Sequence, residues 1–225
     1  YGQGPENDYQ ISRINLSAQS STAQVTINGR KAGELSLVVP GLHNILNALA
    51  AFAAGCALQV NELKLIQGLG NFSGTKRRFE LKGEVNGVKV IDDYGHHPTE
   101  IEVTLTAAKN LAGSGRVLTV FQPHRYSRTS AFTKEFAHSL SLSDFVYLLE
   151  IYAASEKPME GVSSLLISKL MAPEKVKFEP SMLQVVADVA KAAKSGDVII
   201  TLGAGDVSSL SAPILDALMA NELDA

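Results

Sequence analysis

The chain has 225 residues, of which 45% are hydrophobic and 19% are charged, and its formal net charge at pH 7 is −3. A chain of this length and composition can bury a substantial core in one large or two smaller domains. A charge this close to zero gives no general attraction to nucleic acid or anionic membranes, so binding driven by bulk charge is excluded.

The single cysteine, Cys56, lies in the apolar run 48–58. With no second cysteine it cannot form an internal disulfide, and we expect a buried structural thiol in a reducing compartment. The run is too short to cross a bilayer, which needs about 20 residues. The first residues also lack the charged and apolar pattern of a secretion signal. We therefore expect a cytoplasmic protein that does not bind membranes or nucleic acid.

The first seventy residues predict a small β-rich and helical segment. Apolar residues alternate with polar ones on both sides of Asn28-Gly29, which predicts an antiparallel hairpin. Residues 42–58 are rich in alanine and leucine and predict a buried helix. A shorter helix is expected over 61–67, capped by Asn61. Three glycines within 68–74 predict a hinge.

Beyond the hinge, strand and helix patterns alternate along the chain. This order predicts an α/β fold, with a mostly parallel, Rossmann-like sheet and helices on both faces. The predicted strands are 88–91, 117–121, 145–149, 176–178 and 198–202, and the predicted helices are 99–111, 131–140, 163–171, 182–194 and 212–220.

Two polar clusters follow predicted strands. Residues 92–100 (DDYGHHPTE) follow the first strand, and residues 122–129 (QPHRYSRT) follow the next one. Ligands collect at the carboxyl ends of strands in open α/β sheets, so we expect both clusters to line one crevice on neighbouring strands. Arg125 and Arg128 carry forked donors suited to carboxylate or phosphate. Surface solubility is the alternative for these arginines, more so for Arg125.

Three weaker signals remain open. The turn 203–208 (GAGDVS) resembles a dinucleotide loop, but Ser208 replaces the third glycine, so we expect a tight turn that touches a phosphate and no NAD site. Three histidines in the two clusters suggest zinc, but adjacent histidines seldom bind one ion together, so we predict no metal site among these residues. Asn44 and Asn47 share a helix face, where they read a base edge or satisfy the backbone.

Four separated motifs, taken in this order, closely resemble those of the muramyl ligases. They are 41–48 (GLHNILNA), 74–80 (GTKRRFE), 92–100 and 121–129 (FQPHRYSRT). The residues of the last two motifs are similar to those of the branch of the family that adds L-alanine. The resemblance implies an ATP-dependent ligase of bacterial peptidoglycan precursor synthesis, which joins L-alanine to UDP-N-acetylmuramate through an acyl phosphate.

The resemblance also implies roles for individual residues. Which histidine takes the proton from the attacking amine stays open. The implied set comprises Arg78 and His96 in catalysis, Asn44 and Asn47 at the adenine, Asp93 at the ribose, Tyr94 beside the nucleotide or amino acid, and His124, Arg125 and Arg128 at the alanine carboxylate and the anionic intermediate.

Several parts of a complete muramyl ligase are missing from these residues. The phosphate loop Gly-x-x-Gly-Lys-Thr, the magnesium-binding glutamate and histidine, and the UDP-binding domain are not found. We therefore expect residues 1–73 to be the end of a central ATP-binding domain and residues 74–225 to be a complete carboxyl-terminal ligase domain. The ligands of Mg²⁺ would lie mostly outside the chain, and the chain alone is predicted to be inactive without the missing domains.

Other functions fit the same motifs. One is a recycling ligase that adds a whole peptide to UDP-N-acetylmuramate. Another is a noncatalytic nucleotide- or ligand-binding module. A dehydrogenase is more distant, because Ser208 departs from the dinucleotide fingerprint.

Overall fold

The computed structural model describes residues 1–17, 20–72 and 75–221. The chain forms two compact units, Tyr1–Thr75 and Lys76–Ala225. The boundary predicted between residues 73 and 74 falls outside the described residues. Within the described ranges, no helix is long and apolar enough to span a membrane.

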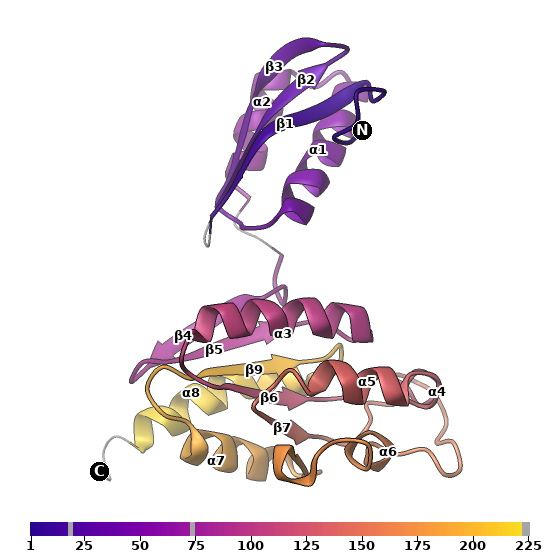
Figure 1. Cartoon of the computed structure of the whole chain (residues 1–225), viewed down its shortest axis with the longest axis vertical. Coiled ribbons are helices and arrows are strands. Elements are labelled where there is room, and N and C mark those ends of the chain that lie inside the picture. Colours follow the sequence, from indigo (N-terminus) through magenta and orange to yellow (C-terminus); the bar gives the residue numbers. More distant parts are fainter. Residues whose placement is uncertain (18–19, 73–74, 222–225) are drawn as a thin grey trace. The chain divides into compact units, whose positions relative to one another are not determined.

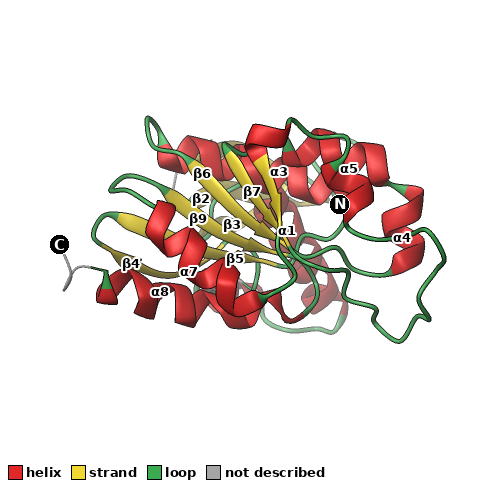
Figure 2. Cartoon of the chain, turned by 90° about the horizontal axis from the view of Figure 1, so that it is seen from below, coloured by secondary structure: helices red, strands yellow, loops and turns green. Residues whose placement is uncertain are grey.

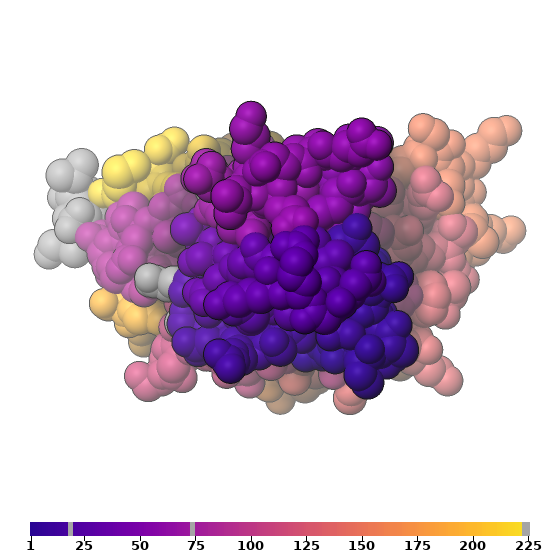
Figure 3. Space-filling view, turned by 90° about the horizontal axis from the view of Figure 1, so that it is seen from above, coloured from indigo at the N-terminus to yellow at the C-terminus, as the bar shows by residue number. Residues whose placement is uncertain are grey.

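The first unit is a three-stranded antiparallel sheet packed against two helices. Its strands are β1 (Tyr9–Leu16), β2 (Ser21–Ile27) and β3 (Arg30–Leu37), in that order, and its helices are α1 (Leu42–Ala57) and α2 (Glu62–Gly70). The predicted hairpin is confirmed: Asn28 and Gly29 have φ of 48° and 77°, the left-handed values that a tight hairpin turn requires. Figure 3 shows one face of this unit in space-filling form, in indigo to purple.

Helix α2 begins as predicted, because Asn61 Oδ1 accepts hydrogen bonds from the amides of Leu63 and Lys64 at 3.0 and 3.2 Å. It runs on to Gly70, so the predicted hinge is wrong for residues 68–70. Apolar side chains of α2, including Leu69, pack against the core of this unit. Such packing outweighs the low helix propensity of glycine.

The second unit contains a six-stranded sheet in the order β4-β5-β9-β6-β7-β8. Strand β4 pairs antiparallel with β5, and all other pairs are parallel. The predicted mostly parallel sheet is therefore confirmed. The strands are β4 (Glu80–Val85), β5 (Val88–Asp93), β6 (Val117–Phe121), β7 (Phe145–Leu148), β8 (Val176–Phe178) and β9 (Val198–Leu202).

Helices cover both faces of this sheet, as predicted (Figure 2). All residues of β6 and β9 are buried between the two layers. One face packs against α3 (Pro98–Ala112), α5 (Thr133–Leu140) and α6 (Leu165–Ser168), and the other against α7 (Met182–Ala192) and α8 (Ser211–Ala220).

Two predicted helices differ in extent. A separate short helix, α4 (Tyr126–Ala131), precedes α5, and Phe132 lies between them. Helix α6 is shorter than the predicted 163–171, because the amides of Leu170 and Met171 bond to carbonyls only three residues earlier. These tighter turns end the regular helix.

One expectation about strand order is wrong. We expected the strands that carry the two polar clusters, β5 and β6, to be neighbours, but β9 lies between them (Figure 1). The chain first forms α7, which covers the face of the sheet opposite to α3 and α5, and then enters the sheet between β5 and β6 as β9. Strand β9 is followed by Gly203, where a Cβ atom would lie 2.6 Å from the carbonyl oxygen of Gln122. Because glycine has no side chain, the backbone of Gln122, directly after β6, can approach the end of β9 closely.

Candidate active site

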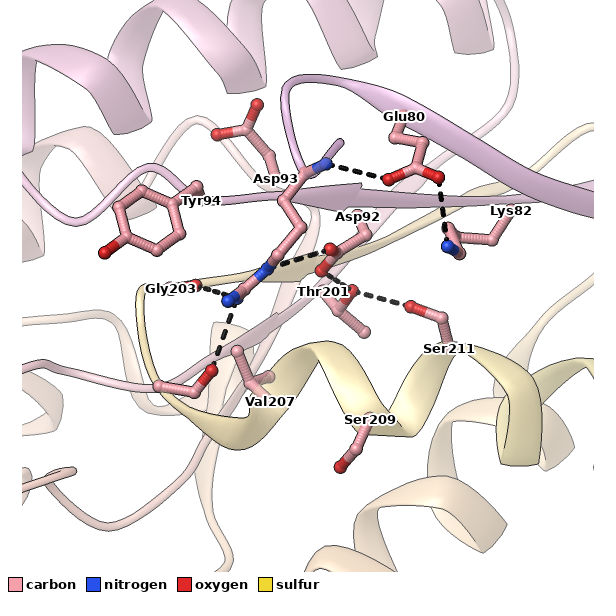
Figure 4. Close-up of polar contacts among 12 residues, drawn as sticks. Glu80, Lys82, Asp92, Asp93, Tyr94, Thr201, Gly203, Val207, Ser209 and Ser211 are labelled. Carbon is pink, nitrogen blue, oxygen red and sulfur yellow. Dashed lines mark hydrogen bonds and ion pairs between the residues drawn. The ribbon is translucent and has the colours of Figure 1, made fainter. Parts of the chain in front are cut away.

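Two aspartates end β5 and point to opposite faces of the sheet (Figure 4). The Asp93 carboxylate is buried and accepts hydrogen bonds from the amides of Phe79 and Gly95, each at 2.7 Å, and from Thr104 Oγ1 at 3.2 Å. Burial raises the pKa of Asp93 more than these hydrogen bonds lower it. Asp93 therefore fastens the segment before β4 to the turn after β5, and its contact with ribose stays a prediction.

The two arginines before β4 have different surroundings. Arg77 turns into the protein, where Nε lies 3.2 Å from Asp92 Oδ2 and a terminal nitrogen lies 2.6 Å from the Gly203 carbonyl. The Arg78 side chain is 52% exposed and lies 3.6 Å from Glu100 Oε1. Arg78 is thus the guanidinium of this pair that is open to an anionic ligand.

The adjacent histidines after β5 have separate roles. His97 caps α3: its Nδ1 accepts a hydrogen bond from the Thr99 amide at 3.3 Å. Its ring also meets the Phe132 ring edge-on, with centroids 5.0 Å apart. These contacts give His97 a structural role, and they explain why two neighbouring imidazoles do not face one ligand.

His96 turns toward the strand ends. Its Nδ1 lies 3.1 Å from the Tyr94 carbonyl and 3.5 Å from Glu100 Oε2. The same carboxylate accepts hydrogen bonds from the amides of His96 and His97. Burial alone would raise the pKa of Glu100, but these amides and the nearby cations outweigh it and lower the pKa. Glu100 is therefore an anion that holds both His96 and Arg78.

The exit of β6 brings a histidine and an arginine together. His124 Nδ1 lies 3.3 Å from a terminal nitrogen of Arg128, and its ring stacks on Tyr152 with centroids 5.5 Å apart. Burial, followed by the positive charge of Arg128, lowers the pKa of His124. A neutral imidazole beside a fixed cation is the result. The rings of His96 and His124 are 6.0 Å apart, so the segments after β5 and β6 meet across the end of β9.

The loop after β7 supports the segment that carries Arg125 and Arg128. The sequence analysis did not identify this loop as part of the site. Glu156 accepts hydrogen bonds from the amide and hydroxyl of Ser127 at 3.0 and 2.6 Å. The carbonyl of Tyr152 accepts a bond from the amide of Arg125 at 2.8 Å. Arg125 is exposed and has a left-handed φ of 74°. The signal that could have identified this loop is a third polar strand exit, after β7.

Gln122 was also missed as a site residue. Its side chain donates to Asp206 Oδ1 at 2.7 Å and accepts from the amide of Val207 at 3.1 Å. The exit of β6 is thereby joined to the turn after β9. A buried glutamine directly after a strand was the available signal.

The predicted adenine residues lie in the first unit. Asn44 Nδ2 donates to the carbonyl oxygen of Pro40 at 2.7 Å, which is the backbone role that the sequence left open. Asn47 is exposed one turn further along α1. Their contact with adenine stays a prediction.

The structure therefore joins five of the predicted residues by direct contacts. Tyr94 meets His96 edge-on at 5.2 Å, and the contacts continue through His124 to Arg128. The Arg78 guanidinium lies 5.7 Å from the centre of the Tyr94 ring. No group of three or more histidine, cysteine, aspartate or glutamate side chains among the described residues could hold a metal ion.

Comparisons with known proteins identify relatives of this chain. The sequence profile described as the Mur ligase, glutamate ligase domain, matches residues 77–205. The UDP-N-acetylmuramate–L-alanine ligase of Renibacterium salmoninarum is 44% identical over 205 residues, covering 91% of this chain and 44% of that protein. The ligase of the same name from Koribacter versatilis is 47% identical over 204 residues, covering 89% and 43%.

Two solved structures share the fold across nearly the whole chain. The UDP-N-acetylmuramate–alanine ligase of Thermotoga maritima has a TM-score of 0.76 and 27% identity, covering 97% of this chain and 47% of that one. A murein peptide ligase of Psychrobacter arcticus has a TM-score of 0.72 and 28% identity, covering 95% and 44%. The chain spans less than half the length of these relatives.

Proposed function

The chain belongs to the Mur ligase family, and from this premise we propose that it is the carboxyl-terminal half of an ATP-dependent ligase. In this proposal the whole protein joins L-alanine to UDP-N-acetylmuramate through an acyl phosphate. Residues 74–225 form its ligase domain, and residues 1–73 belong to the central ATP-binding domain. Its place is the bacterial cytoplasm, in peptidoglycan precursor synthesis.

The observation that carries the proposal is the contact series from Tyr94 through His96 and His124 to Arg128. An incoming amino acid has two chemical needs that this series meets. Its carboxylate needs a forked cation, and Arg128 is suited to bind it through two hydrogen bonds. Its ammonium must lose a proton before the nitrogen can attack.

His124 is the better suited of the two histidines to accept that proton. Burial and the neighbouring Arg128 lower the pKa of His124, which keeps the imidazole neutral at pH 7. The alanine nitrogen then attacks the acyl carbon and forms the amide bond. The bond from that carbon to the phosphate oxygen breaks, and phosphate leaves with the electron pair.

Arg78 suits the phosphoryl-transfer step. Transfer of the γ-phosphoryl group spreads negative charge over its oxygens, which positioned cations stabilise. The half-exposed Arg78 side chain, beside Tyr94 and Glu100, is available for that charge. The described residues do not fit a magnesium site, so any Mg²⁺ ligands would come mainly from the missing part of the protein.

The identity of the amino-acid substrate separates two branches of the family. The curated relatives at 44% and 47% identity carry the name of the L-alanine ligase, which supports that substrate. The fold is also shared with a murein peptide ligase, at 28% identity. A ligase that adds a peptide therefore remains the second candidate.

Phosphate release by the full-length protein tests the substrate. With ATP and UDP-N-acetylmuramate present, we expect release to depend on L-alanine and not on a tripeptide. Release with the tripeptide alone would favour the second candidate. If neither L-alanine nor the tripeptide stimulates phosphate release, both ligase functions are contradicted. The isolated 225-residue chain is expected to release no phosphate with all three substrates.

A further inference from the structure

We propose that Arg77 is a positioning residue of the amino-acid site, which acts through Tyr94. This role rests on the proposed ligase function and concerns a residue that neither the sequence analysis nor the family resemblance assigns to the site. Arg77 precedes Arg78 in the motif 74–80, yet its side chain is directed into the second unit and is 25% exposed.

The backbone explains why consecutive arginines differ. Arg77 and Phe79 have φ of 60° and 48°, in the left-handed region that L-residues rarely adopt. The amide of Arg77 donates to Glu80 Oε2 at 2.7 Å, and Asp93 holds the amide of Phe79. Surrounding contacts must hold such a conformation, and strained backbone of this kind clusters at functional sites.

The guanidinium of Arg77 joins the ends of two strands. It contacts Asp92 at the end of β5, and it donates to the carbonyls of Gly203 and Gly205 after β9, at 2.6 and 3.3 Å. The Asp92 side chain is 2% exposed and also accepts from Thr201 Oγ1 at 2.7 Å. Figure 4 shows Asp92 and Thr201 directed toward each other.

This set of bonds depends on the shape of the arginine side chain. The planar guanidinium presents donors in fixed directions, so it can meet one carboxylate and two carbonyls at once. A lysine ammonium is a compact point charge on a flexible stem. Lysine at position 77 would keep the charge near Asp92 but could not reproduce the fork.

Arg77 also fixes both the backbone and the ring of Tyr94. The amide of Tyr94 donates to the Arg77 carbonyl at 2.7 Å, and the Arg77 guanidinium lies 5.0 Å from the centre of the Tyr94 ring. This is within the range of a cation–π contact. Tyr94 in turn meets His96, the first member of the contact series that leads to Arg128. The effect of Arg77 on the amino-acid site therefore passes through Tyr94.

The same sheet offers a matched control at its opposite end. Arg116 and Asp197 precede β6 and β9, and a terminal nitrogen of Arg116 lies 2.5 Å from Asp197 Oδ2. The Asp197 side chain is 4% exposed, and Arg116 also donates to the carbonyl of Ala192. This is another forked contact to a buried aspartate and a backbone carbonyl, away from the proposed site.

The test compares Arg77→Lys with Arg116→Lys in the full-length protein. We expect Arg77→Lys to raise the KM for L-alanine about tenfold, because Tyr94 begins the contact series that leads to Arg128, and to leave the KM for UDP-N-acetylmuramate within about twofold. Arg116→Lys should lower the melting temperature without changing either KM. A purely structural role for Arg77 would lower kcat through the active fraction and leave both KM values unchanged, which would overturn the proposal.

A double-mutant cycle tests the route through Tyr94. If Arg77 acts through the Tyr94 ring, Arg77→Lys combined with Tyr94→Leu should raise the KM for L-alanine no more than the stronger single variant does. Multiplied effects of the two substitutions would contradict that route.

Hydrogen exchange provides a readout that does not depend on activity. The amides of Tyr94 and Gly203 bond to Arg77 and Asp93 carbonyls, so Asp92→Asn should speed their exchange, while Asp197→Asn should not. Unchanged exchange in Asp92→Asn would overturn the proposal, even if Arg77→Lys fails to fold. Faster exchange without alanine-dependent phosphate release would leave the positioning network supported and the ligase function contradicted.

Discussion

The two ends of the large sheet use buried aspartates in different ways. At the amino end, hydrogen bonds from Arg116 and from two amides outweigh the effect of burial and lower the pKa of Asp197. At the carboxyl end, Asp93 has hydrogen bonds but no ion pair with another described residue, and burial raises its pKa. The amino end thus has one ion pair to a buried aspartate, and the carboxyl end has a comparable one between Arg77 and Asp92. The carboxyl end also has a second buried aspartate, Asp93, and partly exposed cations and imidazoles around it.

The two ends of this sheet therefore contribute differently to the stability of the fold and to the proposed function. Both ends need buried anions to fasten the loops that join strands and helices. The carboxyl end differs in that a half-exposed cation, Arg78, lies beside the ring of Tyr94, from which ring contacts lead to His96 and His124. In open α/β sheets ligands bind outside the carboxyl ends of the strands, which is the end where we propose the site.

The largest expected effect is on phosphoryl transfer. Arg78→Ala should lower kcat about 10²- to 10³-fold, the usual loss when one stabilising donor is removed from a transition state. Steady-state kinetics of the full-length protein measures this. Arg30→Ala is a suitable control, because Arg30 is 61% exposed and paired with Glu62. A decrease in kcat of less than about threefold in Arg78→Ala would contradict the assignment of the site to the carboxyl end of the sheet.

The amino end should respond in stability alone. Arg116→Ala leaves a buried Asp197 carboxylate without its cation and should lower the free energy of unfolding at pH 7 by about 2 kcal/mol, less than for a fully buried pair because Arg116 is partly exposed. Denaturant unfolding measures the loss, and kcat and KM should not change.

The pH dependence of that loss has a defined sign. Because the folded-state pKa of Asp197 lies below its ordinary value of 3.8, its stabilisation is present above that pH and disappears as the pH falls below it. The difference between wild type and Arg116→Ala should therefore shrink below about pH 4. A difference that is constant from pH 7 to pH 3 would show that the ion pair does not stabilise the fold.

A smaller effect is expected from the loop after β7. Tyr152→Ala removes the ring stacked on His124 and should raise the KM for L-alanine about fivefold. Tyr152→Phe keeps the ring and should match wild type. Equal KM values in both variants would show that the stacked ring does not position His124.

The smallest expected change concerns the titration of His124. Its folded-state pKa lies below the ordinary histidine value of 6.5, so its imidazole should titrate below that pH in an NMR experiment on the 225-residue chain. Arg128→Gln removes a positive neighbour and should move the titration to higher pH. In the full-length protein, the acid limb of kcat/KM for L-alanine should move the same way. A shift to lower pH would contradict the electrostatic account of this pair.

Much of the fold follows from local patterns in the sequence. Strands β6 and β9 are continuous apolar runs, and both are buried throughout, as a central parallel strand requires. Strand β4 was not predicted because Glu80–Val85 is polar and largely exposed at the sheet edge. The position of β9 between β5 and β6 depends on the path of the chain in space, which residue patterns do not encode.

The site was predictable in its residue types but not in its division of roles. The clusters after β5 and β6 identified His96, His124 and Arg128, which the structure brings together. The family resemblance named Arg78 and not Arg77, but it gave no physical reason; left-handed backbone at Arg77 and Phe79 accompanies the inward turn of Arg77. Glu156 was missed because it reaches Ser127 from a loop 29 residues away.

The most direct test of the contrast between the two ends is the KM for L-alanine in full-length Arg128→Ala and Arg116→Ala. Loss of a forked, charge-assisted contact to the alanine carboxylate should raise the KM about 10- to 100-fold in Arg128→Ala. Arg116→Ala should keep the wild-type KM although it is less stable. An unchanged KM in Arg128→Ala, or equal increases in both variants, would contradict the assignment of the amino-acid site to the carboxyl end of the sheet.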